Sequence, residues 1–62
     1  MKEIGYFVEM NRKTVRALNK LRQNFDIKNM TIRHMGDKFY NLEMIVKEQD
    51  IAGIEKIIEK II

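Results

Sequence analysis

The stretch NMTIRHMGDKFYNLEMIVK, residues 29–47, decides the fold because it holds two alternating apolar and polar runs around a turn signal. In Asn29–Met35, Met30 and Ile32 lie on one side of an expected strand, opposite Thr31 and Arg33. Phe39–Lys47 alternates in the same way, with one face formed by Tyr40, Leu42, Met44 and Val46. Gly36-Asp37 between the runs is typical of a turn, so the stretch predicts an antiparallel hairpin.

Upstream of the hairpin, the sequence predicts one strand followed by one helix. Lys2–Met10 alternates as a strand with Ile4, Tyr6, Val8 and Met10 on one side. Asn11 is a favoured N-cap residue. The helix after it has an apolar face formed by Val15, Ala17, Leu18, Leu21 and Phe25. Asn24 and Asp26 indicate that this helix ends near them.

Downstream of the hairpin, Asp50 is expected to cap a second helix. Its apolar arc is formed by Ile51, Ile54, Ile57, Ile58, Ile61 and Ile62. Gly53 lies inside this helix, where glycine costs up to about 1 kcal/mol relative to alanine.

The element order is therefore β-α-β-β-α, which predicts an α+β, ferredoxin-like two-layer sandwich in a single domain, residues 1–62. The sheet is expected to be three-stranded and antiparallel in the order 1-3-2, with both helices on one face. The fourth strand of a ferredoxin-like sheet has no counterpart, so strand 1 is expected to be an exposed edge. The expected core consists of Tyr6, Val8, Leu18, Leu21, Phe25, Ile32, Leu42, Met44, Ile54, Ile57, Ile58 and Ile61.

Composition narrows the classes of function. The 62 residues are 45% hydrophobic and 34% charged, with no Pro and no Cys, which favours an element-rich globular domain over a disordered one. No apolar run is long enough for a membrane span, and the absence of Cys fits a cytoplasmic protein. A domain this small buries little surface, which favours self-association.

Charge is concentrated in the first helix. Residues 11–38 carry eight basic and two acidic residues, net +6, against −1 for residues 1–10 and −2 for residues 39–62. Four basic residues without an interleaved acid are candidate contacts for an anionic partner, namely Arg12, Lys13, Arg16 and Lys20. A solvated helix face would show the same pattern.

Four stretches resemble the ACT domain, a small regulatory module of amino-acid metabolism, with the closest likeness to that of acetolactate synthase regulatory subunits. These are Tyr6-Phe7-Val8-Glu9 with Asn11-Arg12, the segment from Phe25 to Ile32, Leu42–Val46, and Ile54–Ile58. The resemblance implies a ferredoxin-like fold and an effector site at the turn formed by Met10, Asn11, Arg12 and Thr14. Lys13-Thr14 stands where the family has Pro-Gly, which favours an assembly role over effector sensing.

Self-association is expected to bury either the exposed edge of strand 1 or the sheet face away from the helices, where Phe7 and Ile45 are the candidate interface residues. Exposed aromatics on such a face can also stack nucleic-acid bases, but the strand 3 segment lacks the Gly-aromatic pattern of RNA-recognition domains. His34 has no second His or Cys partner, and no catalytic, phosphate-loop or metal motif occurs. We therefore expect a non-enzymatic module that needs no cofactor.

Two functions remain open from the sequence. The first is an ACT-like regulatory or assembly module that forms a homo-oligomer and binds an effector or an enzyme partner. The second is a small basic binder of nucleic acid or of an acidic protein surface through its first helix, with nucleic acid the less favoured partner. Neither function involves a membrane.

Overall fold

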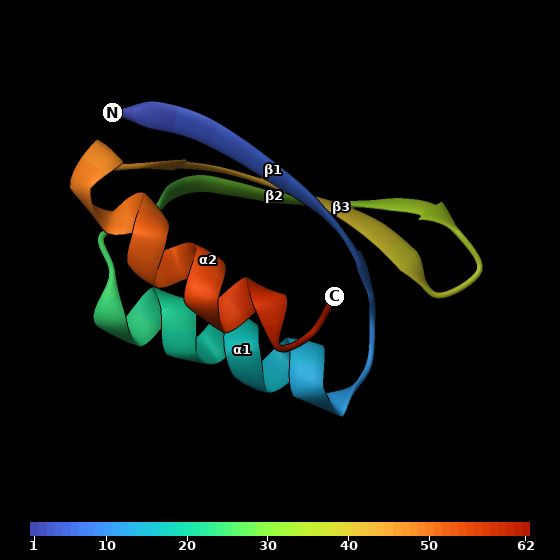
Figure 1. The fold of residues 1–62 in the computed structure, drawn as a ribbon. Coiled ribbons are helices and arrows are strands. Elements are labelled where there is room, and N and C mark those ends of the chain that lie inside the picture. Colours follow the sequence, from blue (N-terminus) through green and yellow to red (C-terminus); the bar gives the residue numbers. More distant parts are fainter.

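The computed structural model describes residues 1–62 and confirms the β-α-β-β-α order (Figure 1). Its elements are β1 (Lys2–Glu9), α1 (Arg12–Asn24), β2 (Lys28–Gly36), β3 (Phe39–Val46), a 3-10 turn η1 (Glu48–Asp50) and α2 (Ile51–Glu59). Neither helix has the length and apolar character needed to cross a membrane.

The three strands form one antiparallel sheet in the order β1-β3-β2, as the sequence predicts. The β1–β3 register is unbroken from the pair Lys2 and Val46 to the pair Glu9 and Phe39. The β2–β3 register shifts twice, and Gly36 adopts a φ of 138°, which side chains rarely allow. The hairpin of β2 and β3 extends beyond the helices (Figure 1).

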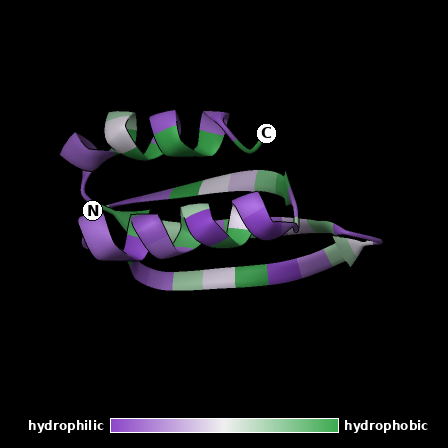
Figure 2. Cartoon of the chain, turned by 90° about the horizontal axis from the view of Figure 1, so that it is seen from below, coloured by the Kyte–Doolittle hydropathy of each residue, from purple (hydrophilic) through white to green (hydrophobic).

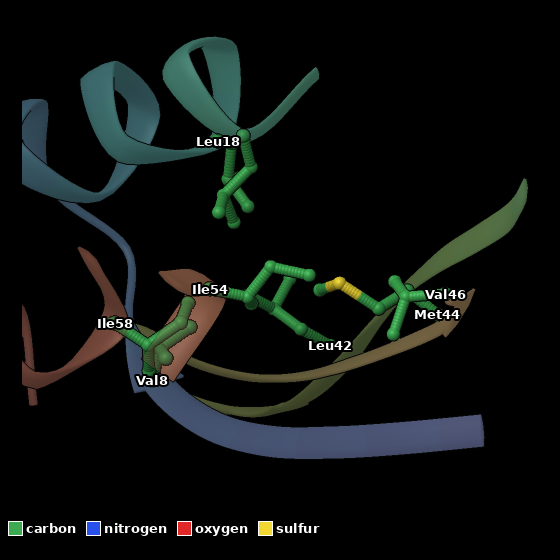
Figure 3. Packing of buried hydrophobic residues seen from close by; sticks show 8 residues of the cluster. Val8, Leu18, Leu42, Met44, Val46, Ile54 and Ile58 are labelled. Atoms are coloured by element: carbon green, nitrogen blue, oxygen red, sulfur yellow. The ribbon is translucent and has the colours of Figure 1, made fainter. Parts of the chain in front are cut away.

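Both helices cover one face of the sheet and enclose the core (Figures 1 and 3). The buried cluster consists of Val8, Leu18, Leu21, Leu42, Met44, Val46, Ile54 and Ile58. Four further residues of the expected core lie half-buried at its margin, namely Tyr6, Phe25, Ile57 and Ile61. Burying such side chains supplies the main driving force of folding, at roughly 25 cal/mol per Å² of apolar surface.

The periodicity of the sequence predicted burial for two apolar residues that are exposed in the structure. Ile32 is 41% exposed, although the sequence pattern predicts it in the core. Figure 2 shows the reason: β2 is the edge strand beyond α1, so no helix covers its inner face there. Val15, expected on the apolar face of α1, is 47% exposed.

The start of α2 also differs from expectation. Asp50 occupies the N-cap position, but its side chain makes no capping hydrogen bond. The turn η1 precedes α2 and already holds the Asp50 backbone in the helical region, at φ −92° and ψ −10°. A capping side chain works from an extended backbone, so the prediction of an Asp50 cap was wrong.

Candidate functional site

The turn between β1 and α1 brings together Met10, Asn11, Arg12 and Thr14, the residues of the expected effector site. Asn11 caps α1, because its Oδ1 accepts a hydrogen bond of 3.0 Å from the Thr14 N–H. The Thr14 hydroxyl is fully buried and donates to the Glu9 carbonyl oxygen at 2.5 Å. The Met10 N–H donates to the Lys38 carbonyl at 2.7 Å, which ties the turn to the hairpin.

This geometry leaves few polar groups free at the turn. The Asn11 and Thr14 side chains are already engaged with each other and with the backbone, so their visible role is to start the helix. The exposed Arg12 and Lys13 carry the unpaired charges there. Effector binding at these residues stays a prediction.

A groove of about 220 Å³ runs between α1 and α2. We call it the basic groove, and it is lined by Lys13, Arg16, Ala17, Lys20, Ile57, Lys60 and Ile61. Its apolar residues are the buried Ala17 and the half-buried Ile57 and Ile61, and its four other residues are cations. The two helices lie side by side in both ribbon views (Figures 1 and 2).

No acid neutralises the basic groove. The ion pairs of the chain lie elsewhere, between Arg33 and Glu43 at 3.7 Å and between Lys47 and Asp26 at 4.0 Å. The four groove cations therefore repel one another across a partly apolar surface, an arrangement that favours binding of a negatively charged group.

Three of the four basic residues predicted from the sequence to contact an anionic partner belong to this groove. Lys13, Arg16 and Lys20 line it, but Arg12 does not. Lys60 was missed because it is far away in the sequence and reaches the groove only through the packing of α2 beside α1.

The sheet face away from the helices, which we call the open face, carries a stacked aromatic pair. The rings of Phe7 and Phe39 have centroids 5.3 Å apart and an interplanar angle of 19°. Phe7 is 57% exposed and Phe39 is 40% exposed, so the pair presents apolar surface to solvent. Offset stacking of this kind contributes about 0.5–1.5 kcal/mol beyond area burial.

The strand register separates Phe7 from Ile45, the other residue of the expected interface. Phe7 faces Asn41 across β1 and β3, whereas Ile45 faces Glu3. The two residue pairs are four residues apart along the strands, or about 13 Å. Phe39 is therefore the direct neighbour of Phe7, and Ile45 is half-buried at the other end of the open face.

A hollow of about 230 Å³ lies on the sheet beside Phe7, lined by Gly5, Tyr6, Phe7, Asn41, Leu42 and Glu43. Gly5 contributes to this hollow because it has no side chain on the open face. An exposed aromatic side chain and a hollow of this kind are thus two residues apart on the same strand.

The titratable groups outside these surfaces show little sign of a reactive centre. No group of three or more His, Asp or Glu residues is arranged to hold a metal ion. The His34 Nε2 lies 2.8 Å from the Asp37 carbonyl, and the ring packs against Tyr40 with centroids 4.9 Å apart. Burial, together with the nearby Glu55 carboxylate, raises the pKa of Tyr6.

Comparison with known proteins adds no relative. No family model matches the chain, and searches of curated proteins and of solved structures found no match. The resemblance to ACT domains therefore remains a prediction from the sequence.

Proposed function

We propose that the chain is a non-catalytic, ACT-like regulatory or assembly module that pairs with a second copy of itself through the open face. The observation that carries the proposal is the combination of the exposed Phe7–Phe39 stack and the hollow at Gly5 on the same surface. A protruding group next to a matching hollow is what a two-fold symmetric interface requires, because both partners present the same residues.

The register supports one particular arrangement. The two-fold axis of this arrangement lies in the interface plane, perpendicular to the strands, and passes the paired residues Tyr6 and Leu42. Rotation about this axis places residue 7 of one copy opposite residue 5 of the other. Phe7 then lies over Gly5 of the second copy, inside the hollow. Packed sheets lie about 10 Å apart, which leaves room for one layer of such side chains.

The same axis aligns other residues of the open face. Phe39 and Ile45 lie at equal distances on either side of the Leu42 position, so the rotation brings each Phe39 opposite Ile45 of the second copy. Asn41 approaches Glu43 of the second copy, where its amide can donate a hydrogen bond to the carboxylate. Glu9 approaches Glu3 of the second copy at the rim, which opposes association.

The exposed edge of β1 is the other surface at which a second copy can pair. Its backbone register is unbroken, and it has neither Pro nor a bulge to protect it. However, α2 lies on the side of β1 away from α1 in Figure 2. A second copy at this edge would bring its own α2 into the same region, which favours the open face as the interface.

The size of the molecule limits the area of the proposed interface. The Cα positions span 32 × 18 × 16 Å, so a face of 32 by 18 Å covers about 580 Å². A stable complex typically buries about 800 Å² per partner, so this face forms only a small interface, and we expect a reversible dimer.

The experiment compares two exposed apolar residues. Phe7→Glu places a charge in the interface, and Val15→Glu places the same charge on the outer surface of α1, where the native side chain is 47% exposed. We expect sedimentation velocity to give a dimer for the wild-type chain and for Val15→Glu, and a monomer for Phe7→Glu. A wild-type monomer, or a Phe7→Glu dimer, would refute the proposal.

A further inference from the structure

We propose that the basic groove binds an acidic amphipathic helix of a partner protein. This inference goes beyond self-association and concerns the helix layer of the molecule, not the open face. It rests on the chemistry of the groove, whose rim is cationic and whose floor is apolar.

The rim determines the charge of the partner. Lys13, Arg16 and Lys20 come from α1, and Lys60 directly follows α2 as its C-cap residue, so the cations approach the groove from both sides. None of them has a carboxylate within 4.0 Å, since the ion pairs of the chain lie elsewhere. Acidic side chains along both flanks of a ligand would relieve this repulsion on both sides at once.

The floor determines the shape of the partner. Ala17 is small, so α1 leaves space beside Ile57 of α2 and Ile61, which follows that helix. A helix that lies in such a groove presents apolar side chains at i, i+3, i+4 and i+7, with its charged residues at the sides. The groove therefore fits a ligand whose apolar stripe is flanked by acids.

A nucleic acid fits the groove less well than an acidic helix. Single-stranded nucleic acids bind through aromatic platforms together with cations, and no aromatic residue lines this groove. A phosphate backbone can pair with the cations of the rim, but it has no apolar groups to cover Ile57 and Ile61 on the floor.

The test uses a synthetic peptide of about 18 residues, long enough to form a helix, with leucines at the four spacings above and glutamates on both flanks. A peptide of the same composition, with its leucines scattered around the helix, is the control ligand. We expect fluorescence anisotropy to show binding of the first peptide and at least about tenfold weaker binding of the second, because only the first has an apolar stripe.

The variants locate the site. Arg16→Glu reverses a charge in the groove, whereas Arg12→Glu reverses one on the same helix outside it. We expect Arg16→Glu to weaken binding by at least about tenfold. Arg12→Glu should weaken binding less, because Arg12 does not line the groove. Ile61→Gln should also weaken binding several-fold, because it removes an apolar contact without changing charge.

Each other outcome contradicts the proposal. Equal losses in Arg12→Glu and Arg16→Glu would mean diffuse attraction by net charge. An unaffected Ile61→Gln would mean that the apolar floor takes no part. If duplex DNA or anionic vesicles bind, this binding is weakened by Arg16→Glu, and the leucine-striped peptide does not bind, then the occupant of the groove is not a helix. Thermal unfolding of every variant checks that the fold is intact.

Peptide binding can be tested independently of self-association. Position 7 lies on the open face, so the Phe7→Glu variant retains the groove.

Discussion

Replacing Gly53 by alanine sets two opposing effects of similar size against each other. Gly53 lies within α2, and alanine is better than glycine in a helix interior by about 0.8–1.0 kcal/mol. If helix propensity alone mattered, Gly53→Ala would stabilise the protein by that amount.

The packing of Phe25 opposes this gain. A Cβ at position 53 would lie 3.0 Å from Cζ of Phe25 and 3.2 Å from its Cε1. Carbon atoms in contact prefer about 3.5–4.0 Å, so the ring must move by at least several tenths of an ångström. Overpacking typically costs about 1–3 kcal/mol, and we expect the lower end because the half-buried ring can move partly toward solvent.

The assay is a double-mutant cycle measured by urea unfolding at one protein concentration. We expect Gly53→Ala alone to change the free energy of unfolding by less than about 0.5 kcal/mol, since the two effects nearly cancel. In a Phe25→Leu background, the ring atoms are gone and the same substitution should stabilise by about 1 kcal/mol. Equal gains in the two backgrounds would show that Gly53 and Phe25 are not coupled and would refute this reasoning.

Three further predictions concern the β1–α1 turn, Tyr6 and the rim of the proposed dimer. Thr14→Val should lower the free energy of unfolding by about 1–3 kcal/mol, because it removes the hydroxyl of a fully buried side chain and its hydrogen bond to the Glu9 carbonyl. Thr14→Ser keeps the hydroxyl and should lose less in the same urea assay. Because burial and then Glu55 raise the pKa of Tyr6 above 10.0, its contribution to stability is intact below pH 10 and is lost as the pH rises through the folded-state pKa. Tyr6→Phe should therefore lose less stability than the wild-type chain between pH 9 and pH 11, and equal losses would argue against it. Glu9→Gln should tighten the proposed dimer in sedimentation equilibrium by removing the repulsion from Glu3, and a weakened dimer would count against the two-fold arrangement.

The sequence was sufficient for the elements and their order because local periodicity and turn chemistry encode both. The alternation around Gly36-Asp37 predicted the hairpin, and Asn11 was correctly identified as the cap of α1. Alternation indicates which face of a strand a residue occupies, but not whether a helix covers that face. This is why Ile32 was placed in the core although it lies on an uncovered edge strand.

The candidate surfaces depended on information that periodicity does not contain. The stacking of Phe7 on Phe39 requires the β1–β3 register, which joins residues far apart in the chain. Lys60 enters the basic groove only through the packing of α2 beside α1. Gly53 looked like a weak point of a helix, whereas its missing side chain makes room for the Phe25 ring.

The central claim is that two copies pair through the open face, with Phe7 of each lying over Gly5 of the other. The most direct measurement is an isotope-filtered NOE experiment on an equal mixture of labelled and unlabelled chains, at a concentration where sedimentation shows the dimer. We expect intermolecular NOEs from the Phe7 ring protons to the Gly5 α-protons. A dimer whose intermolecular NOEs connect β1 backbones or helices instead, or a chain that gives no intermolecular NOE at millimolar concentration, would contradict it.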